Sequence, residues 1–232
     1  MVANLRAMTP QIRRILAGAL LLFPSLFIIV FVLHFRGWGD FLNLKTHYVP
    51  RDPAQVVAAL IRNGTRAPLI HDPHVIAYLS LPLLLAASLA LFAIGQRKRP
   101  NAAAAALVVT LAGTVYMGGV FGMWTAFYRG IGQVDPSQLA GATATFTAMT
   151  NPTGAFLLTT TLAKLTMVGF GLQGLVLLGI GRVPRWSPVI IAAGAVLFIA
   201  FWDLDNWMLV ASLMLLAGFV PLRREILSPD NR

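Results

Sequence analysis

Residues 15–33 read ILAGALLLFPSLFIIVFVL, an apolar run without a charged side chain. A helix needs about 20 such residues to cross the roughly 30 Å hydrocarbon core of a bilayer. Because lipid offers backbone groups no hydrogen-bond partner, this run predicts a membrane-spanning helix. The pattern recurs along the chain, and we expect six spans, at residues 15–33, 73–95, 102–127, 153–181, 187–202 and 207–222.

The composition of the whole chain agrees with a membrane protein. Of its 232 residues, 57% are hydrophobic and only 11% are charged, whereas a soluble domain is about 25% charged. These proportions exclude a soluble enzyme and a disordered chain, and the lack of cysteine excludes disulfides and thiolate chemistry. The formal charge of +10 is spread over short loops, so no nucleic-acid partner is expected. The sequence therefore predicts one all-α transmembrane domain over residues 1–232, a polytopic six-helix bundle surrounded by the lipid bilayer.

The distribution of Lys and Arg predicts the orientation of the bundle. Cations gather in the N-terminal segment, in the loops at residues 97–99 and 182–185, and in the C-terminal tail. By the positive-inside rule these segments face the cytoplasm, which places both termini there, in a cell (inner or plasma) membrane. Trp124 and Trp202 fall near the outer ends of predicted spans, where aromatic rings anchor helices to the interface.

The two long outer loops, residues 34–72 and 128–152, each predict a short helix on the membrane surface. Residues 52–55 (DPAQ) and 135–138 (DPSQ) share a capping Asp, a Pro in the first turn and a Gln three residues after the cap. The shared order indicates either an internal duplication of a two-span unit or two ordinary helix starts. We expect both helices to pack over the outer mouth of the bundle.

Lys164 is the residue that costs most to place in a bilayer. It falls inside the fourth predicted span, where a charged lysine costs roughly 2.5–3.5 kcal/mol, so we expect it to face protein or water. Thr160 and Thr161 lie nearby, and Asp203 and Asp205, in the turn between the last two spans, are its predicted partners. We interpret these five residues as a candidate ligand- or ion-binding site. The alternative is that Lys164 snorkels outward and the acids face water or cap the last helix.

The outer side also carries a second candidate site, made of histidines. His34, His71, His74 and Asp72 offer imidazole and carboxylate groups that could hold a divalent metal such as zinc or copper. His34 and His74 could instead ligate a haem or a chlorin. The alternative is that these histidines only anchor the chain at the interface.

Glycines in the third and fourth spans indicate close helix packing. Small residues allow backbones to approach where lipid provides no hydrophobic drive. The packing face contains Gly118, Gly122, Gly171 and Gly174. Either these two spans pack within the chain, or the glycines receive a membrane-protein partner.

Residues 181–186 (GRVPRW) lead into the fifth span. This stretch and the order of features resemble a diffuse group of uncharacterised bacterial six- or seven-span membrane proteins, which often carry a similar Leu-Pro-Arg-Trp turn. The resemblance implies a multi-pass helical fold and carries no activity over to any residue.

Few polar residues lie in the spans, and no catalytic motif is found. The sequence therefore favours a non-enzymatic integral membrane protein, either a subunit of a membrane assembly or a binder of a small apolar ligand. The first alternative is a small transporter or channel that uses Lys164 with Asp203 and Asp205. The second is a metal-dependent membrane enzyme that uses the outer histidines.

Overall fold

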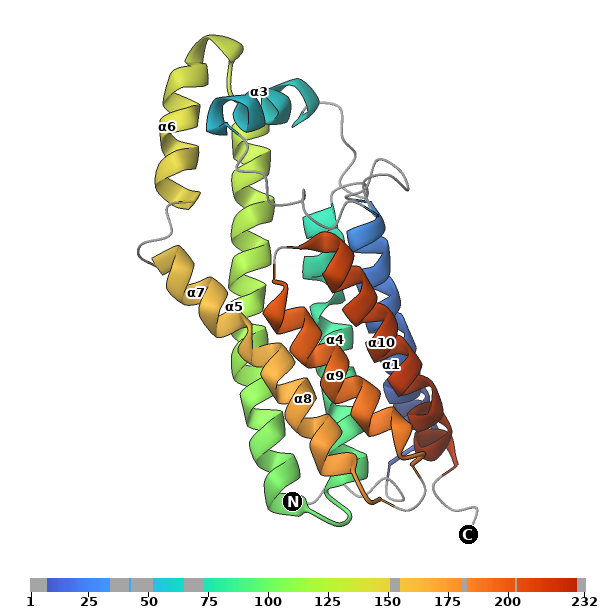
Figure 1. Cartoon of the computed structure of the whole chain (residues 1–232). Helices are drawn as coiled ribbons and strands as arrows, with labels where there is room; N and C mark the ends of the chain where they lie inside the picture. The colour runs from blue at the N-terminus through green and yellow to red at the C-terminus, as the bar shows by residue number, and fades with distance from the viewer. Residues whose placement is uncertain are drawn as a thin grey trace.

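A computed structural model describes residues 8–33, 42, 52–64, 73–150, 155–180, 183–202 and 204–228, and within these ranges all regular structure is helical. The prediction of an all-α bundle is confirmed (Figure 1). In chain order the elements are α1 (Pro10–Val32), α3 (Pro53–Gly64), α4 (Pro73–Gly95), α5 (Pro100–Gly132), the 3₁₀ helix η3 (Pro136–Gln138), α6 (Leu139–Thr150), α7 (Ala155–Ala163), α8 (Leu165–Leu177), α9 (Trp186–Ala200) and α10 (Asp205–Leu227).

Five segments of the described chain are long and apolar enough to cross a membrane. They are α1, α4, α5, residues 157–177 of α7 and α8, and α10. The remaining predicted span corresponds to α9, which has 15 residues and measures about 22 Å. Because α9 packs between α8 and α10, it completes the bundle as a short sixth pass.

The six passes form a closed ring. The main contacts follow the order α1, α4, α5, α8, α9, α10 and back to α1, and α4 also contacts α8 and α10. Phenylalanines fill the centre: the Phe23 ring of α1 stacks on Phe170 of α8 with centroids 5.5 Å apart, and Phe170 contacts Phe219 of α10 at 5.9 Å. These rings are fully buried, so the middle of the bundle is a packed core.

The fourth span is not the single helix predicted for residues 153–181. It breaks at Lys164, where α7 ends and α8 begins. The Lys164 N–H donates to the Thr161 carbonyl at 3.2 Å, a tight i→i+3 bond in place of the α-helical one. The break allows α8 to follow the core while α7 leans toward α6 (Figure 1).

The last span extends further than the predicted residues 207–222, because α10 runs from Asp205 to Leu227. Its final turns are amphipathic: Leu222 and Ile226 are buried, whereas Arg223 and Arg224 are exposed. The helix therefore continues past the apolar stretch that marked the span in the sequence.

The two short helices predicted in the outer loops are present as α3 and α6. They pack on each other and on the outer end of α5, around a second small core that includes Val57, Ile131 and Phe146. The expectation that they cover the mouth of the bundle is corrected, since they lie over the end of α5 (Figure 1). The reason is the length of α5, whose 33 residues measure about 50 Å and exceed the roughly 30 Å hydrocarbon core.

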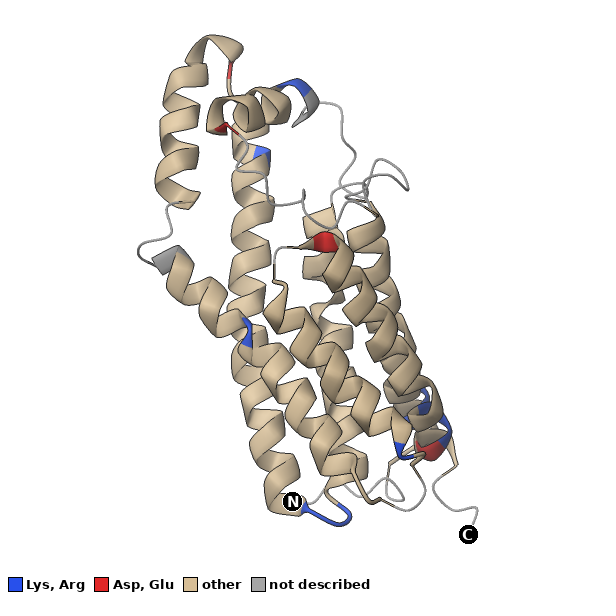
Figure 2. Cartoon of the chain, in the orientation of Figure 1, with Lys and Arg blue, Asp and Glu red and all other residues tan. Residues whose placement is uncertain are grey.

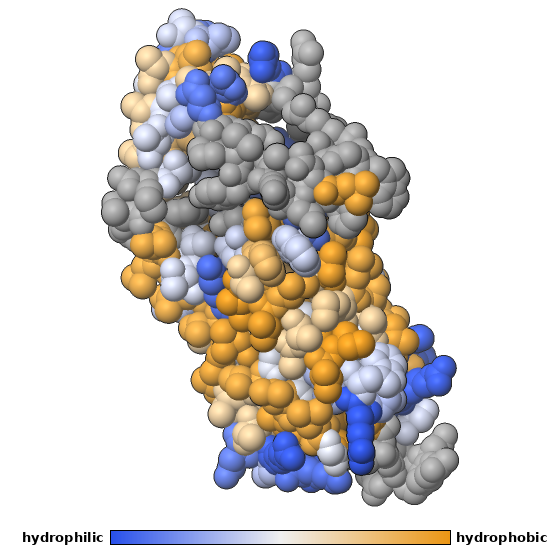
Figure 3. Space-filling view, in the orientation of Figure 1, coloured by the Kyte–Doolittle hydropathy of each residue, from blue (hydrophilic) through white to orange (hydrophobic). Residues whose placement is uncertain are grey.

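Charged residues in the described chain gather at the two ends of the bundle, with Lys164 at the α7–α8 junction between them (Figure 2). An apolar band separates these ends (Figure 3), which is the surface of a membrane-embedded protein. At one end lies the loop at residues 97–99, which we call the basic loop, and its Arg97 forms an ion pair with Glu225 of α10 at 2.6 Å. Lys98 donates to the Gly179 carbonyl at 3.2 Å, so the loop also binds the segment that follows α8.

Candidate functional site

A cavity of about 310 Å³ lies at the end of the ring opposite the basic loop, where α1 ends and α4 and α10 begin. We call it the outer cavity. All six passes contribute to it, the fourth through α7 and not through α8. The last residue of α6 also lines it. Its lining residues are Val30, Phe31, His74, Ala77, Val120, Phe121, Trp124, Thr150, Thr160, Phe198, Trp202, Asp205 and Met208.

Aromatic rings form most of the floor of the outer cavity. Phe31, Phe121 and Phe198 line it, and each of them contacts the fully buried Phe27, with centroids 5.9, 6.2 and 6.1 Å from the Phe27 ring. The three lining rings thus pack on Phe27 of the buried core. A site with this floor suits an apolar group and gives no polar route inward.

Four polar side chains line the outer cavity, each from a different helix: His74, Thr150, Thr160 and Asp205. The His74 ring packs edge-on against Tyr128 at 5.1 Å between centroids and lies 6.3 Å from the Trp124 ring. Asp205 occupies the first turn of α10. The outer cavity therefore combines an aromatic body with a few convergent polar groups, the usual composition of a small-molecule site.

Lys164 contacts the wall of this cavity. Its Nζ atom lies 5.7 Å from the centroid of the Trp202 ring, and Trp202 lines the cavity. This distance is that of a cation–π contact. The sequence predicted Asp203 and Asp205 as partners of Lys164. Among the described residues Lys164 forms no ion pair with Asp205, and Asp203 lies outside the described ranges.

The five residues predicted as a ligand or ion site are only partly brought together. Thr160 and Asp205 line the outer cavity, and Lys164 contacts its wall through Trp202. Thr161 is exposed, and its backbone carbonyl accepts the hydrogen bond from Lys164 at the helix break.

The predicted metal site falls largely outside the described residues. His34, His71 and Asp72 lie there, and only His74 is described. Within the described ranges, no three His, Cys, Asp or Glu residues lie close enough together to hold a metal ion. The divalent-metal, haem and chlorin hypotheses therefore stay predictions.

The glycines predicted to mediate packing all face helices of the same chain. A Cβ atom at Gly118 would lie 3.3 Å from Leu81, and one at Gly122 would lie 3.5 Å from Tyr78. Gly171 faces Ala195, and Gly174 faces the Pro188 carbonyl of α9. These contacts are intramolecular, and a membrane-protein partner at these glycines stays a prediction.

Sequence reasoning did not identify the aromatic wall. The interpretation of Trp124 and Trp202 as interfacial anchors places them near the ends of their helices, where the structure has them. Both faces of these helices are apolar, so the pattern could not show that the two rings turn toward the cavity rather than toward lipid.

The chain matches no protein-family model, and neither a curated protein nor a solved structure matches it.

Proposed function

We propose that this membrane-embedded protein binds a small, largely apolar ligand in the outer cavity. The observation that carries this proposal is the aromatic lining of the cavity, whose rings pack on the buried Phe27, together with a few polar side chains. The volume of about 310 Å³ is at the lower end of the range for ligand pockets, roughly 300–1,000 Å³. This size suits a single ring or a short chain.

The polar groups suggest what kind of ligand fits. Asp205 can accept a hydrogen bond, and the Thr160 hydroxyl can donate or accept one. The Lys164 ammonium contacts the ring of Trp202, which lines the cavity, but Lys164 is not itself a lining residue. We therefore favour a neutral ligand with one polar group, such as a hydroxyl, turned toward Thr160 and Asp205. Because the candidate glycines already face helices of this chain, ligand binding is better supported than the membrane-assembly alternative.

Native mass spectrometry of the gently purified full chain tests the proposal. We expect a small bound molecule in the wild type and its loss in Val120→Phe, because Val120 lines the cavity and is buried. Val108→Phe is the matched control, since Val108 is 63% exposed on the same helix. A ligand that remains bound in Val120→Phe, or no bound molecule in the wild type, would contradict the proposal.

A second candidate function is transport of a small anion, and the helix break favours it. Discontinuous helices place substrate sites in many transporters, and here the break carries Lys164. The direct test is chloride efflux from proteoliposomes. Transport predicts a flux above that of protein-free vesicles, reduced in Lys164→Met. An equal flux with and without protein would contradict chloride transport.

For the location, we propose the cell membrane of a bacterium with both termini in the cytoplasm. In support, α1 begins and α10 ends at the same end of the bundle as the basic loop at residues 97–99 (Figure 2). Because the chain has no cysteine, single-cysteine variants report orientation directly. An impermeant maleimide should label Ala140→Cys in intact cells and Ser228→Cys only after lysis. The reverse pattern would contradict the orientation.

A further inference from the structure

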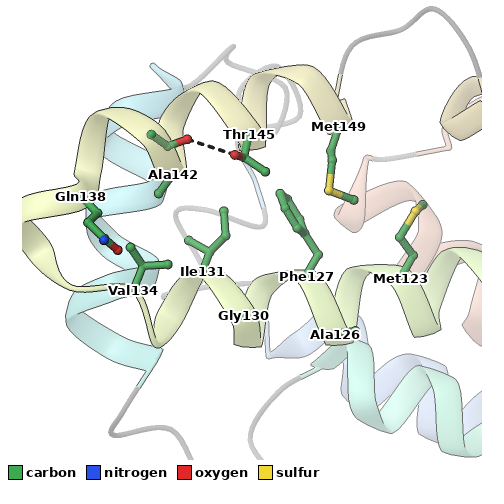
Figure 4. A pocket seen from close by; sticks show the side chains of 11 residues that line it. Met123, Ala126, Phe127, Gly130, Ile131, Val134, Gln138, Ala142, Thr145 and Met149 are labelled. Carbon is green, nitrogen blue, oxygen red and sulfur yellow. Dashed lines mark hydrogen bonds between the residues drawn. The ribbon is translucent and has the colours of Figure 1, made fainter.

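A second hollow, which we call the α5–α6 groove, lies outside the bundle between the protruding end of α5 and helix α6 (Figure 4). Its volume is about 900 Å³. Met123, Phe127 and Ile131 of α5 face Ala142 and Met149 of α6 across it (Figure 4). On another side α3 packs against both helices.

The lining of this groove continues the lipid-facing side of α5. Val108 and Val115 are 63% and 74% exposed in the apolar band of the bundle. Ala126 and Gly130 follow at helical spacing on the same face, are also exposed and line the groove, whereas Gly119, between Val115 and Ala126, faces Thr159 of α7. One face of α5 therefore contacts lipid in the bundle and forms a wall of the groove beyond it.

Helix α6 presents to this groove no charged side chain and no threonine hydroxyl without a hydrogen bond. Its residues 139–150 include no charged side chain. Its threonine hydroxyls bond within the helix, each donating to the carbonyl four residues earlier: Thr143 to Leu139, Thr145 to Gly141, Thr147 to Thr143 and Thr150 to Phe146. Thr145 lines the groove, and its bonded hydroxyl leaves it to contribute mainly apolar surface (Figure 4).

We propose that the α5–α6 groove takes up one hydrocarbon chain of a lipid from the bilayer leaflet on the α3–α6 side. An apolar groove beyond the hydrocarbon core is unfavourable in contact with water, and a hydrocarbon chain removes that contact. The acyl chain enters end-first between Met123 and Met149, at the end of the groove nearest the bundle, and its end reaches toward Gln138. Continuity with the lipid-facing side of α5 favours this occupant over a second copy of the protein or a partner helix.

The experiment uses the full chain in nanodiscs of phosphatidylcholine that contains a phosphatidylcholine with a diazirine at the end of one acyl chain. A chain end normally lies deep in the bilayer, so it labels α6 only when the chain has entered the groove. After irradiation, we expect mass spectrometry to find the label on residues 139–149 as well as on the spanning helices.

Gly130→Leu is the informative variant. A Cβ atom at Gly130 meets nothing within 4 Å, so the new side chain extends into the groove without displacing the backbone. We expect labelling of α6 to fall by about tenfold, because the leucine occupies the space of the lipid chain. Gly18→Leu is the matched control: its Cβ atom also meets nothing within 4 Å, it lies in α1, and labelling should be unchanged.

Two results would overturn the proposal. They are no label on α6 in the wild type, and equal α6 labelling in Gly130→Leu and the wild type. The label on α4 serves as the internal reference that the bundle is intact. Because the outer cavity contributes nothing to this test, its outcome is independent of the proposed ligand.

Discussion

Gly113 of α5 lies directly against the backbone of Thr166 in α8, so closely that a side chain at position 113 would overlap it. Three residues earlier in α5 and three residues later in α8 the relationship is reversed, and Gly169 of α8 lies against Thr110 of α5. The two glycines thus form a reciprocal crossing in which backbones touch. This crossing holds α8 to the core immediately after the break at Lys164.

Replacing Gly113 by alanine should separate the two helices. The added methyl group has no space, so we expect a loss of about 1–3 kcal/mol in unfolding free energy and a lower thermal midpoint in detergent. Gly18→Ala is the control, because its Cβ atom meets open space and alanine favours a helix by up to about 1 kcal/mol. An unchanged midpoint for Gly113→Ala would show that the crossing is looser than described.

The buried hydrogen bond between α8 and α4 should make a modest contribution. The Gln173 side-chain amide donates to the Ser88 hydroxyl at 2.9 Å and to the Ser88 carbonyl at 3.2 Å. Interhelical bonds of this kind are worth about 0.6 kcal/mol on average and up to about 1.7 kcal/mol. A double-mutant cycle of Gln173→Leu and Ser88→Ala, followed by thermal unfolding, should show coupling of that size. Additive effects would contradict it.

Removing the Lys164 ammonium should not weaken the bundle. Its contact with Trp202 contributes about 0.5–2 kcal/mol, whereas keeping a lysine within a span costs roughly 2.5–3.5 kcal/mol. Lys164→Met should therefore leave the thermal midpoint unchanged or raise it. If Lys164→Met is as stable as the wild type or more stable, Lys164 does not serve stability, and this would indicate a functional role. A clear fall in the midpoint would instead make Lys164 a structural residue.

The ion pair at the basic end should couple α10 to the α4–α5 loop. Glu225 is 10% exposed, and its oxygen lies 2.6 Å from the Arg97 guanidinium. Because the pair is mostly shielded from water, we expect a coupling energy of about 1 kcal/mol in a cycle of Arg97→Gln and Glu225→Gln. If no coupling is measured even at low salt, where screening is weakest, the pair contributes nothing.

The start of η3 should loosen at low pH. Hydrogen bonds from the Ser137 hydroxyl and backbone N–H hold the pKa of Asp135 below its usual value. The ionised form is favoured in the folded state, so its contribution is present above the ordinary pKa and is lost as the pH falls through the lowered one. Amide exchange at Ser137 should lose protection in that range, whereas Asp135→Asn should show no such step.

The general architecture could be read from the sequence because the signals are local. Apolar runs give the passes, and the DPSQ motif at residues 135–138 gives the start of η3 correctly, with Asp135 accepting from Ser137 as a cap does. The break at Lys164 could not be read in this way. The flanking sequence is continuous and apolar, and what accompanies the break is the contact of a distant helix, through Gly113.

The candidate site also contains residues that the sequence could predict and residues that it could not. Thr160 and Asp205 were selected from the sequence, and the structure places both in one cavity. The residues that give this cavity its shape were not selected, because a membrane helix is apolar on all sides. In α9, for example, Phe198 faces the core while Val196 is 64% exposed, and hydrophobicity does not distinguish them.

The shortness of α9 has a consequence for the surrounding membrane. This helix measures about 22 Å, whereas α10 beside it has 23 residues and measures about 35 Å. Lipids next to α9 must compress to match it, so head groups dip toward the turn that carries Trp202. The dimple would bring water to the side of the outer cavity, and a ligand dissolved in the interface would reach Asp205 without crossing the bilayer interior.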